Sequence, residues 1–206
     1  MSKSRLERQA FLKTGHWLWA IAMLAMASNP LKPALSVEPG HSQASENPSH
    51  RCTVDSKLRY CDNGDGTVRD NRSGLVWLKD ASCAALAASE DGMLAFREAN
   101  NAAASLKDGI CGLSDGSKAG DWRLPNDKEW KAMRDRAFQN PSFSSPDGTR
   151  KWEPGDIFTG IQPEGYWSST PESDTSDYAW QARLFGGIVV LAGKNIPGYI
   201  WPVRNH

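Results

Sequence analysis

The sequence predicts an α+β domain that is crosslinked by disulfides. Short runs of β-forming residues lie between Asn-Gly and Asp-Gly turn signals, and two other segments carry apolar residues at helical spacing. Along the chain the order is strands, two helices, a long irregular loop, and strands again. Segregated strands and helices of this kind are typical of the α+β class. The four cysteines can form two disulfide bonds.

The first 50 residues precede this domain. Residues 1–27 predict a signal peptide, because basic residues precede the apolar run HWLWAIAMLAMAS and the small-x-small site Ala25-Met26-Ala27 follows it. An uncleaved N-terminal anchor is the alternative, although the run is shorter than the ~20 residues of a membrane span. Residues 28–50 are rich in Pro, Ser, Asn and Gly and predict a flexible linker. The domain itself is expected over residues 51–206.

The charge balance bears on partners and location. The full chain has 24 basic and 24 acidic residues, and removing residues 1–27 takes away four basic and one acidic residue, which leaves a net charge of −3. A mildly acidic domain lacks the basic surface of nucleic-acid-binding proteins, so we expect no nucleic-acid partner. We expect an exported protein of the periplasm, cell surface or medium, with no stable membrane span after signal cleavage.

The four cysteines are Cys52, Cys61, Cys83 and Cys111, and an even number in an exported chain indicates disulfides. Three pairings are possible. We favour Cys52–Cys61, which closes a short segment, and Cys83–Cys111, which brackets a predicted helix. A metal site is the alternative, but no Cys-x-x-Cys motif or nearby histidine supports it.

The first strands are expected near residues 58–62, 66–70 and 74–79, as a meander joined by Asn-Gly, Asp-Gly and Ser-Gly turns. The DNGDG segment also suggests a calcium loop, which needs oxygen ligands at alternate positions. Gly64 and Gly66 occupy the third and fifth positions and carry no side-chain oxygen. The hairpin interpretation therefore explains the segment better, and we expect no metal and no cofactor.

Two helices are expected next. Residues 89–107 place Leu94, Ala99 and Leu106 on one helical stripe, with Ser89 or Asp91 as the cap and Gly109 after the end. The second helix begins after Asn126 and ends near Phe138. Its Asn126 and Glu129 have the spacing of a capping box. Its basic residues suggest a surface for a sulfated sugar, but the acidic residues among them favour an ordinary solvated face.

The last third is loop-rich over residues 139–165 and then returns to strands. Strands are expected over 166–170, 178–185 and 188–191, with Gly186-Gly187 as a two-residue hairpin turn, and a final strand over 199–204. The long loop is either functional or held in place by its aromatic residues.

Six blocks in this order resemble the Lcl C-terminal domain family, long known as a domain of unknown function, over about residues 58–204. They are NGDGTVRDNRSGLVWLKD, ICGLSD, GDWRLPNDKEW, GYWSST, the strand Tyr178–Trp180, and WPVR. The block WRLPNDKEW also resembles a block of the C-type-lectin-like and formylglycine-generating-enzyme group. The resemblance implies a C-type-lectin-like fold, in which two helices pack on a small mixed or antiparallel sheet.

The resemblance also implies functions. Members are typically exported bacterial proteins, and the best-known member is an adhesin whose C-terminal domain trimerises and binds sulfated glycosaminoglycans. This chain lacks that protein's collagen-like repeat, so trimerisation does not carry over. The formylglycine-generating relatives use cysteine chemistry near the C-terminal end, where this chain has no cysteine.

Three functions are therefore open. The first is a non-catalytic glycan-binding domain in adhesion, with sulfated polysaccharide among the candidate ligands. The second is a structural or protein-interaction module of the envelope. The third is a hydrolase that uses carboxylates alone, among which Asp156, Glu164, Glu172, Asp174 and Asp177 are candidates. No nucleophile and base are arranged for other catalysis, so we expect a protein that is not an enzyme.

A glycan site needs an exposed aromatic face beside polar groups. Trp77, Trp122, Trp130 and Trp201 are expected in the core, whereas Trp152 lies in the long loop and is expected to be exposed. The predicted ligand-binding residues are Arg150, Lys151, Trp152, Tyr166, Trp167 and Arg183.

The block DWRLPNDKEW is the clearest motif, and we interpret it as structural rather than as a ligand site. Trp122 and Leu124 alternate as on a strand with one buried face, Pro125 restricts the turn into the helix, and Trp130 anchors that helix. Arg123 then points away from Trp122 and Leu124, where its guanidinium is expected to brace an acid or several carbonyls. Asn126 and Glu129 complete the motif.

Overall fold

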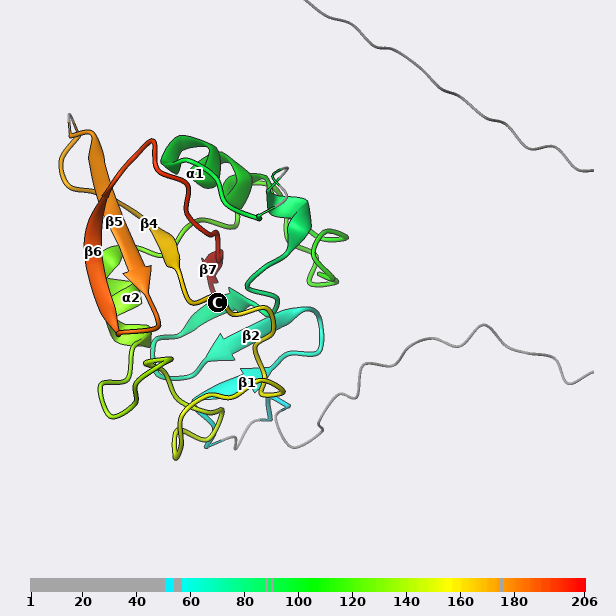
Figure 1. Ribbon diagram of the computed structural model, residues 1–206. Coiled ribbons are helices and arrows are strands. Elements are labelled where there is room, and N and C mark those ends of the chain that lie inside the picture. The colour runs from blue at the N-terminus through cyan, green and yellow to red at the C-terminus, as the bar shows by residue number, and fades with distance from the viewer. Residues whose placement is uncertain (1–50, 54–56, 88, 90, 175) are drawn as a thin grey trace, which may run out of the picture. The chain divides into compact units, whose positions relative to one another are not determined.

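Two antiparallel sheets and two α-helices form the described part of the chain (Figure 1). The computed structural model describes residues 51–53, 57–87, 89, 91–174 and 176–206, all within the unit Ala44–His206. The predicted signal peptide and the predicted linker, residues 28–50, lie outside the described residues. The α+β class is confirmed, with two small sheets where one was expected.

The first sheet has the strand order β1-β2-β3-β7, and all neighbours are antiparallel. Its strands are β1 (Tyr60–Asp62), β2 (Thr67–Asp70), β3 (Leu75–Leu78) and β7 (Val203–Asn205). The meander follows the turn signals, because Gly64 and Gly66 adopt φ angles of +81° and +84° that other residues rarely adopt. The last strand is shorter than predicted, since Tyr199 forms a single bridge to Tyr166 in the other sheet.

The second sheet has the order β4-β5-β6, again antiparallel. Its strands are β4 (Gly165–Pro171), β5 (Tyr178–Arg183) and β6 (Ile188–Gly193). The connection between β5 and β6 has four residues, Leu184–Gly187, instead of the predicted two-residue turn. This turn pairs Tyr178 with Gly193 and Trp180 with Leu191.

Helix α1 (Phe96–Ser105) begins seven residues after the start predicted at Ser89. The reason is a tertiary pairing: Leu94 exchanges two backbone hydrogen bonds with Gly198, of 3.0 and 2.9 Å, and so cannot enter the helix. The N-cap is therefore Ala95, which supplies no side-chain cap. Gly109 lies beyond the end of the helix, which is capped at Leu106.

Helix α2 (Asp127–Met133) begins as predicted and ends early. Asn126 Oδ1 accepts hydrogen bonds from Lys128 N and Glu129 N, and Glu129 Oε2 accepts one from Asn126 N, which completes the capping box. The helix stops before the predicted Phe138, because Arg134 is extended and its guanidinium donates to the carbonyl of Gly187, in the turn between β5 and β6.

The core is an aromatic cluster around Trp201. The ring centroid of Trp201 lies 5.0 Å from Phe158, 5.2 Å from Trp77 and 5.5 Å from Tyr166. The prediction that Trp77, Trp122, Trp130 and Trp201 lie in the core is confirmed, since all four are at most 1% exposed.

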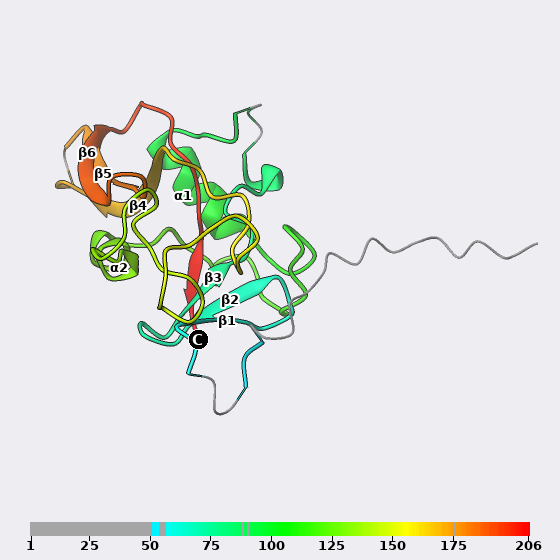
Figure 2. The ribbon, with the colours of Figure 1, turned by 60° about the horizontal axis from the view of Figure 1, so that its bottom comes forward.

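The long loop, residues 139–164, connects α2 to β4 and contacts both halves of the fold (Figure 2): Tyr60 N donates to the Pro146 carbonyl, and Ser142 N donates to the Leu184 carbonyl after β5. Its aromatic residues hold it there: Phe143 stacks on Trp152 and lies edge-on to Phe158 and Trp201. The loop thus contributes to the core that joins the sheets, which explains how so long a segment stays ordered without regular structure.

Candidate functional site

Three of the predicted ligand-binding residues are buried. Tyr166 and Trp167 are 0% exposed and Trp152 is 7% exposed, so none offers a ring face to a ligand. The prediction that Trp152 is exposed is wrong, because the ring stacks on Phe143 at 5.3 Å and the loop packs inward. Burial also raises the pKa of the Tyr166 hydroxyl.

The predicted basic residues do not gather around those rings. Arg150 is held in its own loop, where its Nη atoms donate to both carboxylate oxygens of Asp156 at 2.9 and 2.5 Å. These hydrogen bonds raise the pKa of the Arg150 guanidinium. Lys151 is half-buried and pairs with Ser144, and Arg183 is exposed at the end of β5 opposite Gly165.

The DWRLPNDKEW block connects helix α2 to strand β7. Arg123 donates to the two carboxylate oxygens of Glu129 at 2.7 Å each, and its backbone exchanges hydrogen bonds with Val203 of β7. The hydrogen bonds to Glu129 raise the pKa of the Arg123 guanidinium. The side chains of Trp122, Leu124 and Trp130 are buried, and so is Pro125. The side chains of Arg123, Asn126 and Glu129 therefore all have partners inside the fold.

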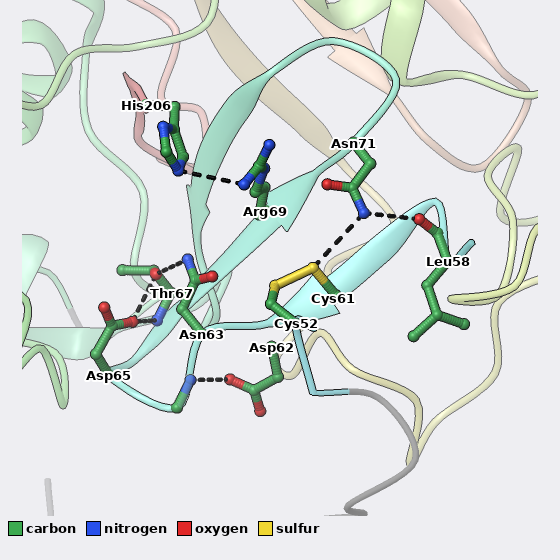
Figure 3. Close-up of a disulfide and its surroundings, with 11 residues drawn as sticks. Cys52, Leu58, Cys61, Asp62, Asn63, Asp65, Thr67, Arg69, Asn71 and His206 are labelled. Atoms are coloured by element: carbon green, nitrogen blue, oxygen red, sulfur yellow. Dashed lines mark hydrogen bonds between the residues drawn. A yellow bond between two sulfur atoms is a disulfide. The ribbon is translucent and has the colours of Figure 1, made fainter. Parts of the chain in front are cut away.

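The two disulfides are those that we favoured from the sequence, Cys52–Cys61 and Cys83–Cys111, and no cysteine is free. Figure 3 shows the first bond beside the turn that the calcium hypothesis concerned. There Asp62 accepts from Gly64 N at 2.8 Å, and its other oxygen accepts from Lys79 Nζ at 2.6 Å. Asp65 accepts from the backbone and hydroxyl of Thr67. These carboxylates act as turn and ion-pair groups.

A different part of the surface combines an exposed aromatic ring with polar groups. At the open end of the β5–β6 hairpin, a hollow of about 500 Å³ is lined by Asp177, Tyr178, Gly193, Lys194 and Asn195. We call it the Tyr178 pocket. The Tyr178 side chain is among the most exposed large apolar side chains described, since the residue is 52% exposed.

Hydrogen bonds hold the walls of the Tyr178 pocket in place. Lys194 N donates to the Asp177 carbonyl at 2.7 Å, and Lys194 Nζ donates to the Ser176 carbonyl. Tyr178 N donates to Ser176 Oγ at 3.0 Å. Among the described residues, the Asp177 carboxylate, the Tyr178 hydroxyl and the Asn195 amide find no hydrogen-bond partner, so they remain available to a ligand.

Gly193 leaves room for the amide of Asn195. It pairs with Tyr178 across the hairpin, and a Cβ atom at this position would lie 2.9 Å from Asn195 Oδ1. The amide oxygen of Asn195 therefore lies over Gly193. On β5, Trp180 shares the face of Tyr178 because side chains alternate along a strand. Lys131 Nζ lies 5.6 Å from the centroid of the Trp180 ring.

Sequence reasoning missed this pocket, although it named Asp177 as an acid and placed Tyr178 on a strand. The pocket depends on which residues face each other across the hairpin. A two-residue turn at Gly186-Gly187 would have placed Asn195, rather than Gly193, opposite Tyr178. The four-residue turn changes this register.

Two further hollows have other linings. One of about 490 Å³ contains Asp115, Asp121, Arg123 and Arg204, but Arg123 is engaged by Glu129 and Arg204 Nε donates to Asp115 at 3.2 Å. The other, of about 160 Å³, lies between Cys83 and Tyr199. Neither of these hollows has a lining aromatic ring as exposed as Tyr178.

The described part of the chain offers few groups for catalysis or metal binding. His206 is the single described histidine and lies 3.3 Å from Arg69 Nη1. Asp156 is engaged by Arg150, and Glu172 accepts from Ser176 Oγ at 2.7 Å. The described residues contain no cluster of three or more metal-ligating side chains. Within the described ranges, no helix has both the length and the apolar character to span a bilayer.

The two disulfides are typical of proteins that mature in an oxidising, exported environment. Comparison with known proteins gives one positive result. No curated protein has a sequence that matches this chain. The family model of the Lcl C-terminal domain matches residues 66–204, which include both sheets except β1 and the last residue of β7. By this match, which spans more than half of its length, the chain belongs to the Lcl C-terminal domain family.

Proposed function

We propose that this protein is an exported, non-catalytic glycan-binding domain of the bacterial envelope or surface, and that the Tyr178 pocket holds the sugar. The observation that carries the proposal is the pocket's composition. Tyr178, which is half exposed, lines the pocket together with Asp177, Lys194 and Asn195, and the Lys194 ammonium is held by the Ser176 carbonyl. A sugar has apolar C–H faces that stack on an aromatic ring, and hydroxyls that pair with carboxylates and amides.

The preorganised backbone of the Tyr178 pocket favours ligand binding. The pocket's backbone is fixed by hydrogen bonds, so a ligand meets groups that are already positioned and loses less conformational entropy on binding. The free acceptors are of two kinds, a carboxylate at Asp177 and an amide at Asn195. Together they suit vicinal hydroxyls of a sugar residue.

The charge of the pocket distinguishes between classes of glycan. Asp177 and Lys194 have opposite charges, so the pocket itself suits a neutral sugar. A sulfated polysaccharide would need additional cations, and Lys128 and Lys131 of α2 are exposed on the neighbouring helix. Because Lys131 is already paired with Asp127 at 2.7 Å, we propose a neutral glycan as the principal ligand.

The fold supports the proposal as well. Two helices, two small antiparallel sheets and a long aromatic loop agree with a C-type-lectin-like arrangement, which we propose for this family member. Many unrelated functions share one fold, so the main support for binding is the pocket.

A glycan array tests the proposal, with the full chain as probe and with neutral glycans and heparin among the targets. We expect binding to neutral glycans, and at least a tenfold loss of affinity in Tyr178→Ala, as for a central aromatic contact. Phe185→Ala is the matched control: Phe185 is 38% exposed at the opposite end of the same hairpin, and its removal should leave the affinity unchanged.

A second variant tests the geometry without removing the ring. Gly193→Ala would displace the Asn195 amide, so we expect it to weaken binding while Tyr178 stays in place. The proposal would be refuted if the wild-type chain bound no glycan on the array, or if Tyr178→Ala and Phe185→Ala lost the same amount of affinity. If the chain bound heparin alone and salt weakened this binding, the site would instead be assigned to the lysines of α2.

An alternative function is a protein-interaction module of the envelope. The observation that favours it is the set of exposed apolar side chains on the β5–β6 hairpin: Phe185 (38%), Ile188 (45%) and Leu191 (40%), together with Ile196 (52%) just beyond it. This surface adjoins the Tyr178 pocket, since Ile196 Cγ1 would lie 3.5 Å from a Cβ atom at Gly193, but its apolar side chains differ in chemistry from the polar groups of the pocket.

A further inference from the structure

Strand β6 ends its sheet with an unpaired edge. The order of the second sheet is β4-β5-β6, and β6 has β5 on one side alone (Figure 1). Lys194 N donates to the Asp177 carbonyl of the β5 side. Hydrogen-bonded pairs alternate along an antiparallel ladder, so the N–H and C=O groups of Ala192, Val190 and Ile188 also point toward β5. The N–H and C=O groups of Val189 and Leu191 therefore point outward, and no described residue bonds to them.

The other sheet edges are all covered. At β1, Cys52 N donates to the Asp62 carbonyl and Tyr60 N to the Pro146 carbonyl. At β7, Val203 exchanges two hydrogen bonds with Arg123. Tyr199 covers β4 through a parallel bridge to Tyr166. Within the described ranges, β6 is thus the one edge strand whose backbone is left open along its length.

The composition of β6 is that of a central strand. The segment Ile188–Gly193 reads IVVLAG, a continuous apolar run without charge or proline. Strands that are covered on both faces have such runs, whereas free edge strands in proteins are normally protected by charged residues, proline or bulges. Apolar side chains are exposed on both faces of β6, with Ile188 on one and Leu191 on the other.

We propose that β6 pairs antiparallel with β6 of a second copy of this chain, which joins two three-stranded sheets into one. The strand is complementary to itself: with Val190 opposite Val190, Val189 and Leu191 form hydrogen-bonded pairs and Ile188 faces Ala192. Beyond the strand, Gly193 faces Gly187 and Lys194 faces Gly186, so no two like charges meet. This pairing goes beyond the glycan proposal and does not depend on it.

The exposed area indicates a dimer of modest strength. Phe185, Ile188, Leu191 and Ile196 expose 38–52% of their surface, or about 300 Å² per copy if a large side chain has about 180 Å². The two copies would then bury about 600 Å² from these residues, and the backbone and neighbours add to this toward the ~1,000 Å² of a specific interface. We therefore expect micromolar self-association.

Sedimentation velocity of the full chain over a range of concentrations measures the association without any glycan present. We expect a monomer–dimer equilibrium in the wild type. Val190→Lys places two ammonium groups face to face at the symmetry axis and should raise the dissociation constant at least tenfold. Val190→Thr keeps the shape of the side chain without the charge, so it should change the constant much less.

A crosslinking variant tests the register even if Val190→Lys fails to fold. A non-hydrogen-bonded antiparallel pair has its Cα atoms about 4.5 Å apart, which is within the range for a disulfide. Val190→Cys should therefore give a covalent dimer on mild oxidation, and Ala104→Cys, on the exposed side of α1, should not. Reduction should return the Val190→Cys chain to the equilibrium of the wild type.

A wild-type chain that stays monomeric up to high micromolar concentration would overturn the proposal. So would equal crosslinking of Val190→Cys and Ala104→Cys, or a dimer that Val190→Lys leaves intact. The glycan proposal is judged separately, because Val190→Lys should still bind glycan with Tyr178 in place. Loss of the dimer and loss of sugar binding are therefore distinguishable outcomes.

Discussion

The guanidinium of Arg123 and the carboxylate of Glu129 share two hydrogen bonds of 2.7 Å each, and this pair joins three parts of the fold. Glu129 also accepts from the backbone N of Asn126 and so completes the cap of α2. The backbone of Arg123 pairs with Val203 in β7. The pair thus fixes the start of the helix to the edge of the first sheet.

The first prediction concerns this pair. Arg123→Lys keeps the charge but loses the planar fork that binds both carboxylate oxygens, so the free energy of unfolding should fall by about 1–2 kcal/mol. Chemical denaturation measures the change. Arg97→Lys is the control, because the Arg97 side chain is 85% exposed and should change stability by less than about 0.5 kcal/mol. Equal effects of the two substitutions would contradict a bracing role for Arg123.

The second prediction compares the effects on stability of removing Trp152, which was expected to bind ligand, and Tyr178, which is exposed. Trp152→Ala removes a buried ring stacked on Phe143, so the free energy of unfolding should fall by about 3–5 kcal/mol. Tyr178→Ala removes a ring that is 52% exposed and should cost about 1 kcal/mol or less. Thermal or denaturant unfolding of both variants makes the comparison, and a larger loss in Tyr178→Ala would contradict it.

Local signals predicted the parts of the fold that depend on local chemistry. The meander follows from glycines at positive φ angles, and α2 begins where Asn126 and Glu129 cap it. The start of α1 could not be predicted in this way, because Leu94 is held extended by Gly198, a residue far along the chain. Long-range pairing of this kind overrides helical periodicity and leaves no local signal.

The candidate site was harder to predict than the fold for a related reason. Trp152 lies in a polar loop between Lys151 and Glu153, and local sequence gives no sign that the loop turns inward onto Phe143. The Tyr178 pocket depends on the register of a hairpin, which the four-residue turn sets. A change of register alters every cross-strand neighbour, so correct strands alone do not locate the pocket.

The third prediction compares the two disulfides. Cys83–Cys111 joins residues 28 apart in sequence, and Cys52–Cys61 joins residues 9 apart. A longer loop loses more entropy in the unfolded chain when it is closed. Replacing both cysteines of the longer loop by Ala should therefore cost about 3.5 kcal/mol, against about 2.5 kcal/mol for the shorter. Denaturation of the two double variants tests the order, and a costlier loss of Cys52–Cys61 would contradict it.

The fourth prediction concerns acid stability. Asp147 accepts hydrogen bonds from the Ser145 hydroxyl at 2.6 Å and from Thr149 N at 3.1 Å, and these bonds lower the pKa of its carboxyl to about 2. In the unfolded chain the pKa is about 3.9. Because the folded-state pKa is the lower one, the carboxylate stabilises the fold fully above pH ~4 and this stabilisation is lost as the pH falls toward 2.

The size of this effect is limited by solvent. A shift of that size corresponds to at most about 2.5 kcal/mol, and the exposure of Asp147 reduces it to about 0.5–1 kcal/mol. Asp147→Asn should therefore lower the free energy of unfolding by about 0.5–1 kcal/mol at pH 6, and the difference from the wild type should disappear near pH 2. Asp174→Asn is the control, because Asp174 is exposed and no described residue hydrogen-bonds to it. A difference for Asp147→Asn that is constant from pH 6 to pH 2 would show that the hydrogen bonds do not depend on the charge of the carboxylate.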